Sequence, residues 1–533
     1  MRFSLCASIV LLSACSAAPC PAPLAQPVAS TRPVASARPC DLPPAQPGRV
    51  RFRVTADASL GSSPLSGRLL VLWSTAPARK ETLNLDWEST QLASTMIDSL
   101  RPGSTVELDP DALAYPKPFS QMPAGTYQLM ALLDPDGSFL RTGIDAHDLR
   151  GPVVQVTLDP AHSAPVDLRL DTRVPFVEPK DPAGVTTVHF ESPLLSAFFG
   201  EPTKTRVAIA VPDGATAAKP VPTVYLIGGF GGSYDKINKR AAEIRRAMTA
   251  PPWNQMAFAY LDGDIPAGHS VFADSVNTGP WSRVLVEELI PYLEKKFPLV
   301  RKPEGRFVTG HSSGGWASLW LQVTHPDFFG GTWSTAPDPV DFHTFFGADI
   351  TPSSTDNLLF GRDGRPRSFF RDSRGDLMTL GDIVRFQTVA AGDRGGPLST
   401  MEWVFSPRGQ DGVPLPLFNR TTGEVSPEVK RAWVKYDIHE LLASRWKELG
   451  PKLGGKIHLV CGAQDSFHLE VSTQRLCDFL KEKGSDATCE MVPGGTHFNL
   501  YTDAQAAPNG LLARMVQAML DQYRAGAKRG KRR

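Results

Sequence analysis

Five residues at the end of an apolar run, Gly310, His311, Ser312, Ser313 and Gly314, form the motif G-x-S-x-G. The spacing alone is weak evidence, because a chain this rich in glycine produces it by chance. Here an apolar run precedes the motif and an amphipathic stretch follows it, which predicts a tight turn from a strand to a helix. Such a turn tolerates only very small residues two positions away from the serine. It also presents the serine hydroxyl at a helix N-terminus, where amide groups favour negative charge. Ser312 is therefore a candidate nucleophile.

An alcohol is a poor nucleophile at neutral pH and needs a base that is held by an acid. When the serine lies on such a turn, the acid and then the histidine follow it along the chain. Asp465 comes just after the penultimate strand-like run, and His497 lies between the last such run and the final helical stretch. Both positions fall at the sheet edge that carries Ser312. The sequence therefore predicts a triad of Ser312, Asp465 and His497.

Other residues compete for these two roles. His468 is a rival for the base, although it follows Asp465 too closely to face it as a third member. Asp338 and Asp341 follow another strand end and are alternatives for the acid. An aspartate in such a place can also cap a helix or close a turn.

The oxyanion that forms during ester cleavage needs hydrogen-bond donors. The apolar run Thr223–Ile227 leads into a glycine-rich stretch, residues 228–232, whose backbone can approach a substrate closely. We assign one donor to the amide of Phe230, with Gly231 as its rival, and the other to the amide of Ser313. Gly229 and Gly231 are expected to contact the substrate. The stretch lacks the G-K-[S/T] of a phosphate loop.

The elements that must position these residues lie between residues 181 and 527, where apolar strands alternate with amphipathic helices. This rhythm predicts an α/β fold with a mostly parallel sheet covered on both faces. The predicted strands are Thr205–Val211, Thr223–Ile227, Met256–Leu261, Arg306–Thr309, Thr332–Ser334, Ile457–Val460 and Glu490–Val492. The predicted helices are Pro280–Phe297, Gly314–Thr324, Ser472–Lys483 and Leu511–Tyr523. The alternation of strands and helices stops at about residues 338–453, which predicts a large insertion over the carboxyl edge of the sheet.

Residues 48–180 have a different pattern, with short alternating strands separated by turn residues such as those at 134–137. The runs Arg68–Trp73, Tyr127–Leu133, Val153–Leu158 and Val166–Leu170 are examples. This pattern predicts an all-β, Ig-like sandwich domain. No catalytic group of residues stands out in it. A packing or spacer role is the simplest interpretation, and carbohydrate or partner binding is the alternative.

The N-terminus carries an export signal. Residues 1–15 comprise a basic start, a short apolar run and Leu12-Ser13-Ala14-Cys15, which resembles a bacterial lipobox, so Cys15 is expected to carry the lipid anchor. A plain signal peptide cut near Ala17 is the alternative. Residues 16–47 are rich in proline and alanine and predict an extended tether. The protein is thus expected to be lipid-anchored in a bacterial cell envelope, facing the periplasm.

Cysteine and charge patterns narrow the function further. Export allows a disulfide between Cys477 and Cys489, with two buried thiols as the alternative. Neither C-x-x-C nor H-E-x-x-H occurs, and we predict no metal or cofactor.

The basic residues of the tail, 528–533, offset a mildly acidic body in a chain of net charge +1, so a nucleic-acid partner is not expected. The tail itself is expected to be disordered.

These motifs together resemble an esterase family of the α/β-hydrolase fold, related to esterase D, feruloyl esterases and mycolyltransferases. The resemblance covers residues ~186–527 and is carried by the runs 228–232, 310–314, 462–467 and 494–497. It implies the triad named above, with 272–281 as a loop beside the nucleophile. Within that loop Asn277 and Trp281 would contact the substrate, as would Trp316 after the nucleophile. Many relatives have His-Gly where this chain has Gly228-Gly229, so the oxyanion loop is expected to be supported differently.

The sequence therefore predicts an exported serine hydrolase that cleaves carboxylic esters through an acyl-enzyme. Its expected substrate is a small-molecule or carbohydrate-linked ester. One alternative is a non-catalytic envelope scaffold with a degenerate hydrolase fold, and another is an acyltransferase.

Overall fold

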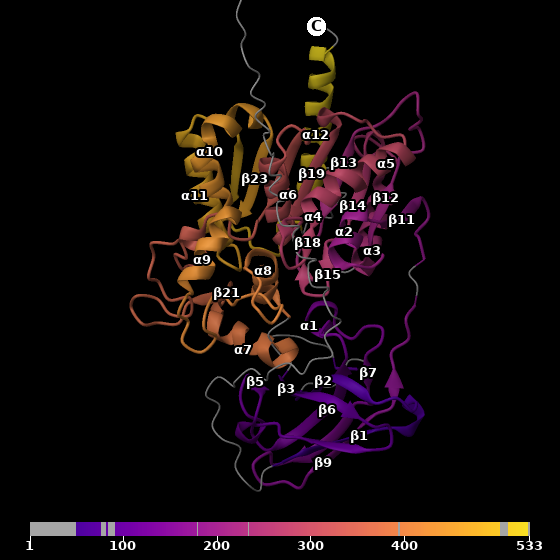
Figure 1. The fold of residues 1–533 in the computed structure, drawn as a ribbon, viewed down its shortest axis with the longest axis vertical. Coiled ribbons are helices and arrows are strands. Elements are labelled where there is room, and N and C mark those ends of the chain that lie inside the picture. Colours follow the sequence, from indigo (N-terminus) through magenta and orange to yellow (C-terminus); the bar gives the residue numbers. More distant parts are fainter. Residues whose placement is uncertain are drawn as a thin grey trace, which may run out of the picture.

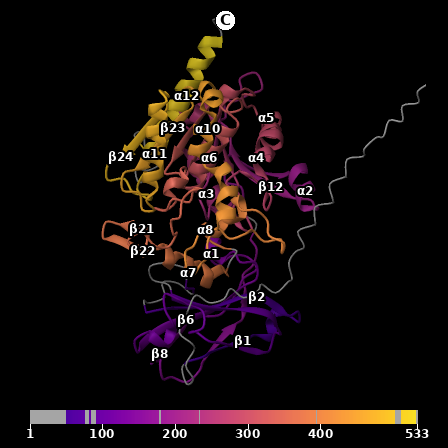
Figure 2. The same ribbon diagram turned by 60° about the vertical axis from the view of Figure 1, so that its left-hand side comes forward.

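The computed structural model describes residues 50–75, 82–83, 91–177, 180–232, 234–392, 395–501 and 510–530. The predicted signal, Cys15, the tether and residues 531–533 lie outside these ranges. A strand-rich N-terminal part packs against one end of a larger α/β part (Figures 1 and 2). No helix in the described ranges is long and apolar enough to span a bilayer.

The N-terminal part consists of two sheets. The smaller contains β4 (Thr105–Leu108), β1 (Phe52–Ala56) and β9 (Val166–Leu170), in that order. The larger has the order β10 (Thr172–Arg173), β7 (Leu149–Arg150), β6 (Gly125–Asp134), β2 (Leu65–Ser74), β3 (Gln91–Leu100) and β5 (Ala114–Tyr115), and β8 (Val154–Leu158) also pairs with β6. One apolar core joins the facing sides of both sheets. At its centre, Phe119 packs against Phe52, Trp73 and Tyr127.

The larger sheet is buried on its outer face as well, which the alternating pattern did not predict. In β2, the residues from Leu69 to Trp73 are all buried. Alternate residues point to opposite faces of a strand, so both faces must be covered. The outer face packs on helix α7 (Leu380–Ala391) of the insertion, where Tyr115 meets Phe386 with ring centroids 5.0 Å apart and Ser94 Oγ donates to the Val389 carbonyl at 2.6 Å. The N-terminal part therefore supports the insertion directly.

The α/β part contains one eight-stranded sheet, which confirms the predicted fold class. Its order is β11 (Val185–Glu191), β12 (Lys204–Ala210), β14 (Ala257–Leu261), β13 (Thr223–Ile227), β19 (Arg306–His311), β20 (Gly331–Thr335), β23 (Ile457–Gly462) and β24 (Thr488–Val492). From β14 to β24 all neighbours are parallel, whereas β12 runs antiparallel to both of its neighbours. The carboxyl ends of the parallel strands thus share one edge.

Helices cover both faces of this sheet. One apolar cluster joins it to α3 (Tyr234–Ala247) and α12 (Leu511–Gly530). The opposite cluster joins it to α5 (Ile290–Lys296), α6 (Ser313–Thr324), α10 (Ile438–Leu453) and α11 (Leu469–Glu482). The predicted helix 280–297 is divided into α4 (Trp281–Arg283), a π-helical turn at Val284–Leu289 and α5. Helix α12 continues to Gly530, so the tail begins as a helix rather than as the expected disordered end.

The insertion is more regular than the sequence suggested. It contains a hairpin of β21 (Ser368–Asp372) and β22 (Gly375–Thr379), followed by α7, α8 (Pro397–Phe405) and α9 (Pro427–Trp433). Helix α10, which the sequence placed in the insertion, packs against α6 as part of the layer that covers the sheet. Short pairs β15–β16 (Asp264–Ile265, Gly268–His269) and β17–β18 (Asp274–Ser275, Gly279–Pro280) face the insertion, which contributes helix α8 next to them.

A disulfide joins Cys477 on α11 to Cys489 on β24. Cys461 is a buried free thiol. The disulfide fastens the helix that follows Asp465 to the last strand of the sheet, directly before the loop that carries His497.

Replacing both cysteines, in Cys477→Ser/Cys489→Ser, should lower the free energy of unfolding by about 3 kcal/mol, because closing a loop of this size restricts the unfolded chain by that order. Denaturant unfolding with and without a reducing agent measures the effect. Reduction should destabilise the wild type and leave the double variant unchanged. Equal sensitivity of both proteins to the reducing agent would contradict the prediction.

Candidate active site

The turn at Ser312 is held in a backbone conformation that few residues adopt. Ser312 has φ 60° and ψ −125° between β19 and α6, a strained combination for a residue with a side chain. A Cβ added at Gly310 would lie 2.2 Å from the Gly314 carbonyl oxygen, and one added at Gly314 would lie 2.2 Å from the Ile227 carbonyl oxygen. Only glycine fits at both positions, so the close approach of β13, β19 and α6 explains the G-x-S-x-G motif.

Asp465 and His497 lie together at the same sheet edge. Asp465 follows β23, and its Oδ2 is 2.8 Å from His497 Nδ1, with both side chains buried. Its Oδ1 accepts the backbone N–H of Phe467 at 2.9 Å, which fixes the carboxylate. Since a carboxylate accepts, Nδ1 carries the proton and Nε2 is left free to act as a base. The Phe467 ring packs edge-on against His497 with centroids 4.8 Å apart.

His311, the variable residue of the motif, connects the nucleophile turn to the histidine loop. Its Nε2 is 3.0 Å from the His497 carbonyl oxygen and must donate, because a carbonyl only accepts. The two imidazole rings lie 4.5 Å apart. Burial, and next the nearby His497, lower the pKa of His311 from 6.5 to about 3. His311 is therefore a neutral residue that positions the His497 loop, a role that the sequence did not reveal.

The Ser312 hydroxyl is not hydrogen-bonded to His497 within the described part of the chain. Its Oγ instead donates to Asp338 Oδ1 at 3.4 Å. Catalytic hydrogen bonds are often long or misaligned before substrate binds. Asp338 interacts electrostatically with His497, and His311, which precedes Ser312, lies against the His497 ring, so Ser312, Asp338 and His497 are neighbours. Of the three candidate acids, the predicted Asp465 contacts His497, and the alternative Asp338 contacts Ser312. Asp341 forms an ion pair with Arg475 instead.

The glycine-rich stretch lies over the nucleophile, as the oxyanion assignment requires. A Cβ added at Gly229 would be 3.2 Å from Ser312 Cβ, so the chain passes in direct contact with the serine. Gly231 has φ 73°, and the Gly232 amide donates to the Gly229 carbonyl at 3.0 Å, which closes a tight turn. Phe230 follows Gly229 in this turn. Ser313 begins α6, where helix geometry leaves its amide free of an intrahelical partner.

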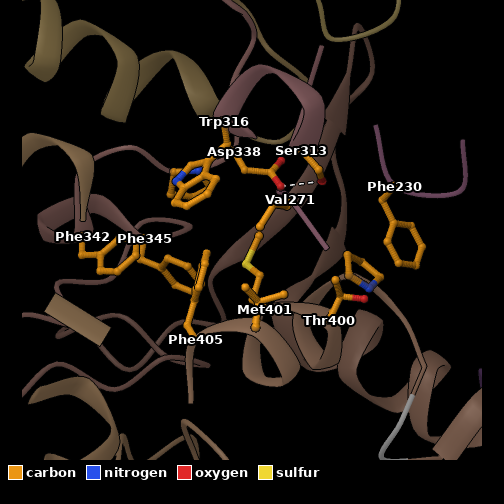
Figure 3. Close-up of a pocket in the computed structure, with 13 residues that line it drawn as sticks. Phe230, Val271, Ser313, Trp316, Asp338, Phe342, Phe345, Thr400, Met401 and Phe405 are labelled. Carbon is orange, nitrogen blue, oxygen red and sulfur yellow. Dashed lines mark hydrogen bonds between the residues drawn. The ribbon is translucent and has the colours of Figure 1, made fainter. Parts of the chain in front are cut away.

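A narrow, mainly apolar pocket adjoins the nucleophile (Figure 3). Three predicted site residues, Phe230, Ser313 and Trp316, line it together with Asp338. The remaining lining residues are Val271, Pro339, Phe342, Phe345, Pro397, Thr400, Met401, Val404 and Phe405. Most of these follow β20 or come from α8, so the insertion forms one wall. The sequence analysis missed them, although the aromatic run at 342–346 was a usable signal.

Of the predicted substrate contacts, Trp316 lines this pocket, whereas Gly229, Gly231, Asn277 and Trp281 do not. Asn277 donates through Nδ2 to the Ser406 carbonyl at 2.8 Å, and its Oδ1 accepts from Arg408 at 3.3 Å. Trp281 donates to the Thr278 carbonyl at 2.7 Å and packs edge-on against Phe272. Neither is among the residues that line the pocket. Their polar atoms are used to join the 274–281 loop to itself and to the end of α8.

One group in the described ranges has the residue types of a metal site. Asp341, His343 and His439 place possible ligand atoms within 4.8 Å of one another. Asp341, however, already accepts Arg475 Nε at 2.6 Å and His343 Nδ1 at 2.9 Å. A guanidinium on the same carboxylate opposes a divalent cation, so this group fits a structural ion pair better than a metal centre.

His311 also makes the fold sensitive to acid. Between its ordinary pKa of 6.5 and its folded value of about 3, His311 is protonated only in the unfolded chain, so lowering the pH removes stability at about 1.4 kcal/mol per pH unit. His311→Gln keeps a donor for the His497 carbonyl but cannot titrate. Its free energy of unfolding, measured by denaturant from pH 6.5 downward, should therefore fall less steeply than that of the wild type.

The exposed His189 supplies the control for this measurement. His189→Gln should keep the wild-type slope, and comparing slopes rather than absolute values removes any constant cost of the substitution. If the slopes of His311→Gln and the wild type are parallel, folding does not hold His311 in its neutral form and the prediction is wrong.

Comparisons with known proteins show the family to which the chain belongs. A family model described as "Putative esterase" matches residues 201–478, more than half of the chain. No curated protein matches. Similar solved structures include the Staphylococcus aureus serine hydrolase FphF (16% identity, 63% of this chain, 98% of that chain, TM-score 0.36). Another is a ferulic acid esterase from Anaeromyces mucronatus (14% identity, 63% of this chain, 91% of that chain, TM-score 0.32). A third is an S-formylglutathione hydrolase from Agrobacterium tumefaciens (13% identity, 64% of this chain, 94% of that chain, TM-score 0.36). The chain belongs to this esterase family and is a carboxylic ester hydrolase.

Proposed function

We propose that the protein is an exported serine esterase in which Ser312 is the nucleophile, His497 the general base and Asp465 the residue that orients the base. One observation carries the proposal. A serine in a strained turn directly follows His311, which contacts a buried histidine, His497, whose Nδ1 is bound to a carboxylate at 2.8 Å. These are the parts that activate an alcohol at neutral pH.

In the proposed reaction, Ser312 Oγ attacks the ester carbonyl carbon while its proton passes to His497 Nε2. Asp465 stabilises the imidazolium that results. When the tetrahedral intermediate collapses, the bond to the alcohol oxygen breaks and His497 returns the proton to that oxygen. Water then attacks the acyl-enzyme with His497 again as the base, which releases the carboxylic acid and restores the Ser312 hydroxyl.

The oxyanion of each tetrahedral intermediate would be bound by the backbone amides of Phe230 and Ser313, with Gly231 as the alternative to Phe230. The contact between Gly229 and Ser312 supports this assignment, because it brings the glycine-rich turn against the reacting oxygen. Donors fixed by the backbone lose no orientation during the reaction. The aromatic and methionine walls of the pocket favour an apolar or aryl acyl group on a small-molecule ester.

The lipobox-like sequence supports an anchored location for this activity. We propose that Cys15 is lipidated and that the tether holds the enzyme away from the membrane surface, on the periplasmic side of a bacterial envelope. A disulfide between Cys477 and Cys489 is compatible with an oxidising compartment.

A fluorophosphonate probe tests the nucleophile. The wild type should be labelled and Ser312→Ala should not, because the probe reacts only with an activated serine. Asp465→Asn should lower kcat on a p-nitrophenyl ester by at least about 1,000-fold, since the asparagine favours the wrong tautomer of His497. Ser444→Ala, on the exposed side of α10, is the matched control and should behave as the wild type. A folded wild-type protein that resists the probe would favour the scaffold alternative.

Fractionation of bacterial cells tests the anchor. The wild type should be found with the membranes, and Cys15→Ala should lose this association because the proposed lipid is attached to that cysteine. Acyl-chain labelling of the protein provides an independent readout. If the wild type is soluble and unlabelled, the plain signal peptide near Ala17 is the better interpretation.

A further inference from the structure

The pocket contains a half-buried carboxyl group, that of Asp338, which the proposed triad does not use. Asp338 Oδ2 accepts the Ser313 hydroxyl at 2.6 Å, and Oδ1 accepts the Ser312 hydroxyl at 3.4 Å (Figure 3 shows the Ser313 contact). Its backbone N–H donates to the Ser312 carbonyl at 3.2 Å. These three bonds fix Asp338 directly beside the reacting oxygen.

The rest of the pocket offers this carboxyl no counter-charge. None of the lining residues is a lysine, arginine or histidine. The nearest titratable partner of opposite sign is His497, which is already bound to Asp465. Five of the thirteen lining residues are aromatic, namely Phe230, Trp316, Phe342, Phe345 and Phe405. A carboxyl group among aromatic rings forms a site with the chemistry that binds an organic ammonium group.

A negative charge at this place also works against catalysis on a neutral ester. The oxyanion would form next to Ser312 and the Ser313 amide, and Asp338 contacts the side chains of both residues. Like charges this close in a water-poor site repel strongly. Loss of solvent outweighs the hydrogen bonds from Ser313 and Ser312 and raises the pKa of Asp338, whereas a cation beside the carboxyl would favour its charged form. A cation supplied by the substrate would remove the conflict.

We infer that Asp338 is a specificity-determining residue that binds an ammonium group on the acyl part of the substrate, next to the ester carbonyl, so that the enzyme prefers esters of aromatic or apolar α-amino acids. This inference rests on the proposed function. Asp338 Oδ1 lies 3.4 Å from Ser312 Oγ, the atom that attacks the carbonyl carbon of the ester. An ammonium group bound by Asp338 must therefore be attached close to that carbonyl carbon. An α-amino group meets this condition, whereas an amino group on the alcohol lies further away along the chain.

Matched esters test the inference with the full-length enzyme. L-phenylalanine methyl ester and methyl 3-phenylpropanoate differ only in the α-amino group. At about pH 7, below the usual pKa of an α-amino group, the wild type should show a kcat/KM about 10- to 100-fold higher for the amino ester, the range of a charge-assisted hydrogen bond. Asp338→Asn should abolish this preference and raise kcat/KM for the neutral ester, because the charge beside the oxyanion is gone.

Several controls separate the possible outcomes. Asp363→Asn, which removes a 62% exposed carboxylate of the same insertion, should keep the wild-type preference. Methyl 2-hydroxy-3-phenylpropanoate has a neutral donor at the same place, and cleavage as fast as that of the amino ester would overturn an ammonium site. An unchanged preference in Asp338→Asn that is still labelled by the fluorophosphonate would overturn the role of Asp338. A wild-type protein that cleaves none of these esters and is not labelled by the fluorophosphonate would instead refute the proposed function.

Discussion

The close approach of three backbones at Ser312 constrains most of the α/β part. Helix α6 can begin against the Ile227 carbonyl only because Gly314 has no side chain, and β19 can turn into it only because Gly310 has none. The strained conformation of Ser312 persists because the surrounding sheet and helix hold it from both sides. Since β13 and β19 are parallel neighbours, the same packing brings the glycine-rich turn after β13 over the serine. The packing of β13, β19 and α6 at Gly310 and Gly314 therefore positions both the candidate nucleophile and the candidate oxyanion donors.

The second constraint is the support given to the insertion. Helix α7 packs on the outer face of the larger N-terminal sheet, and α8 follows it to form a wall of the pocket. Tyr115 and Ser94 thus act at a distance on the shape of the pocket, through helices that a rigid sheet holds in place. This gives the N-terminal part a packing role, the simpler of the two interpretations of its sequence. It also explains why β2 lacks strict alternation, since both of its faces must be apolar.

The sequence predicted the elements whose pattern is local. Thr223–Ile227 and the other buried parallel strands were found within a few residues, because an apolar run bounded by turn residues needs no tertiary information. The motif at Ser312 was interpretable for the same reason. The helices of the insertion were missed because they are short, begin with proline in two cases, and bury their faces only against distant segments. The sequence favoured Asp465 over Asp338 and Asp341 as the acid, and the contact of Asp465 with His497 agrees with that choice, but the contact of Asp338 with Ser312 depends on tertiary packing at the end of β20 and was not predicted. Asn277 and Trp281 were placed at the substrate by resemblance, but their polar groups are used to hold a loop.

The charges around Ser312 suggest why recognition and catalysis are coupled in this protein. The proposed triad needs one carboxylate, Asp465, to stabilise the imidazolium of His497. A second carboxyl, Asp338, accepts the hydroxyl of Ser312 and the hydroxyl of Ser313, whose amide is a proposed oxyanion donor. His311 adds no compensating charge, because burial keeps it neutral. Any positive charge that balances Asp338 during the reaction must therefore come from His497 or from the substrate. When the substrate carries an ammonium group, that cation balances Asp338, and the charge of protonated His497 remains available to stabilise the oxyanion and to protonate the leaving group. Asp338 would then both select the substrate and lower the barrier to its cleavage.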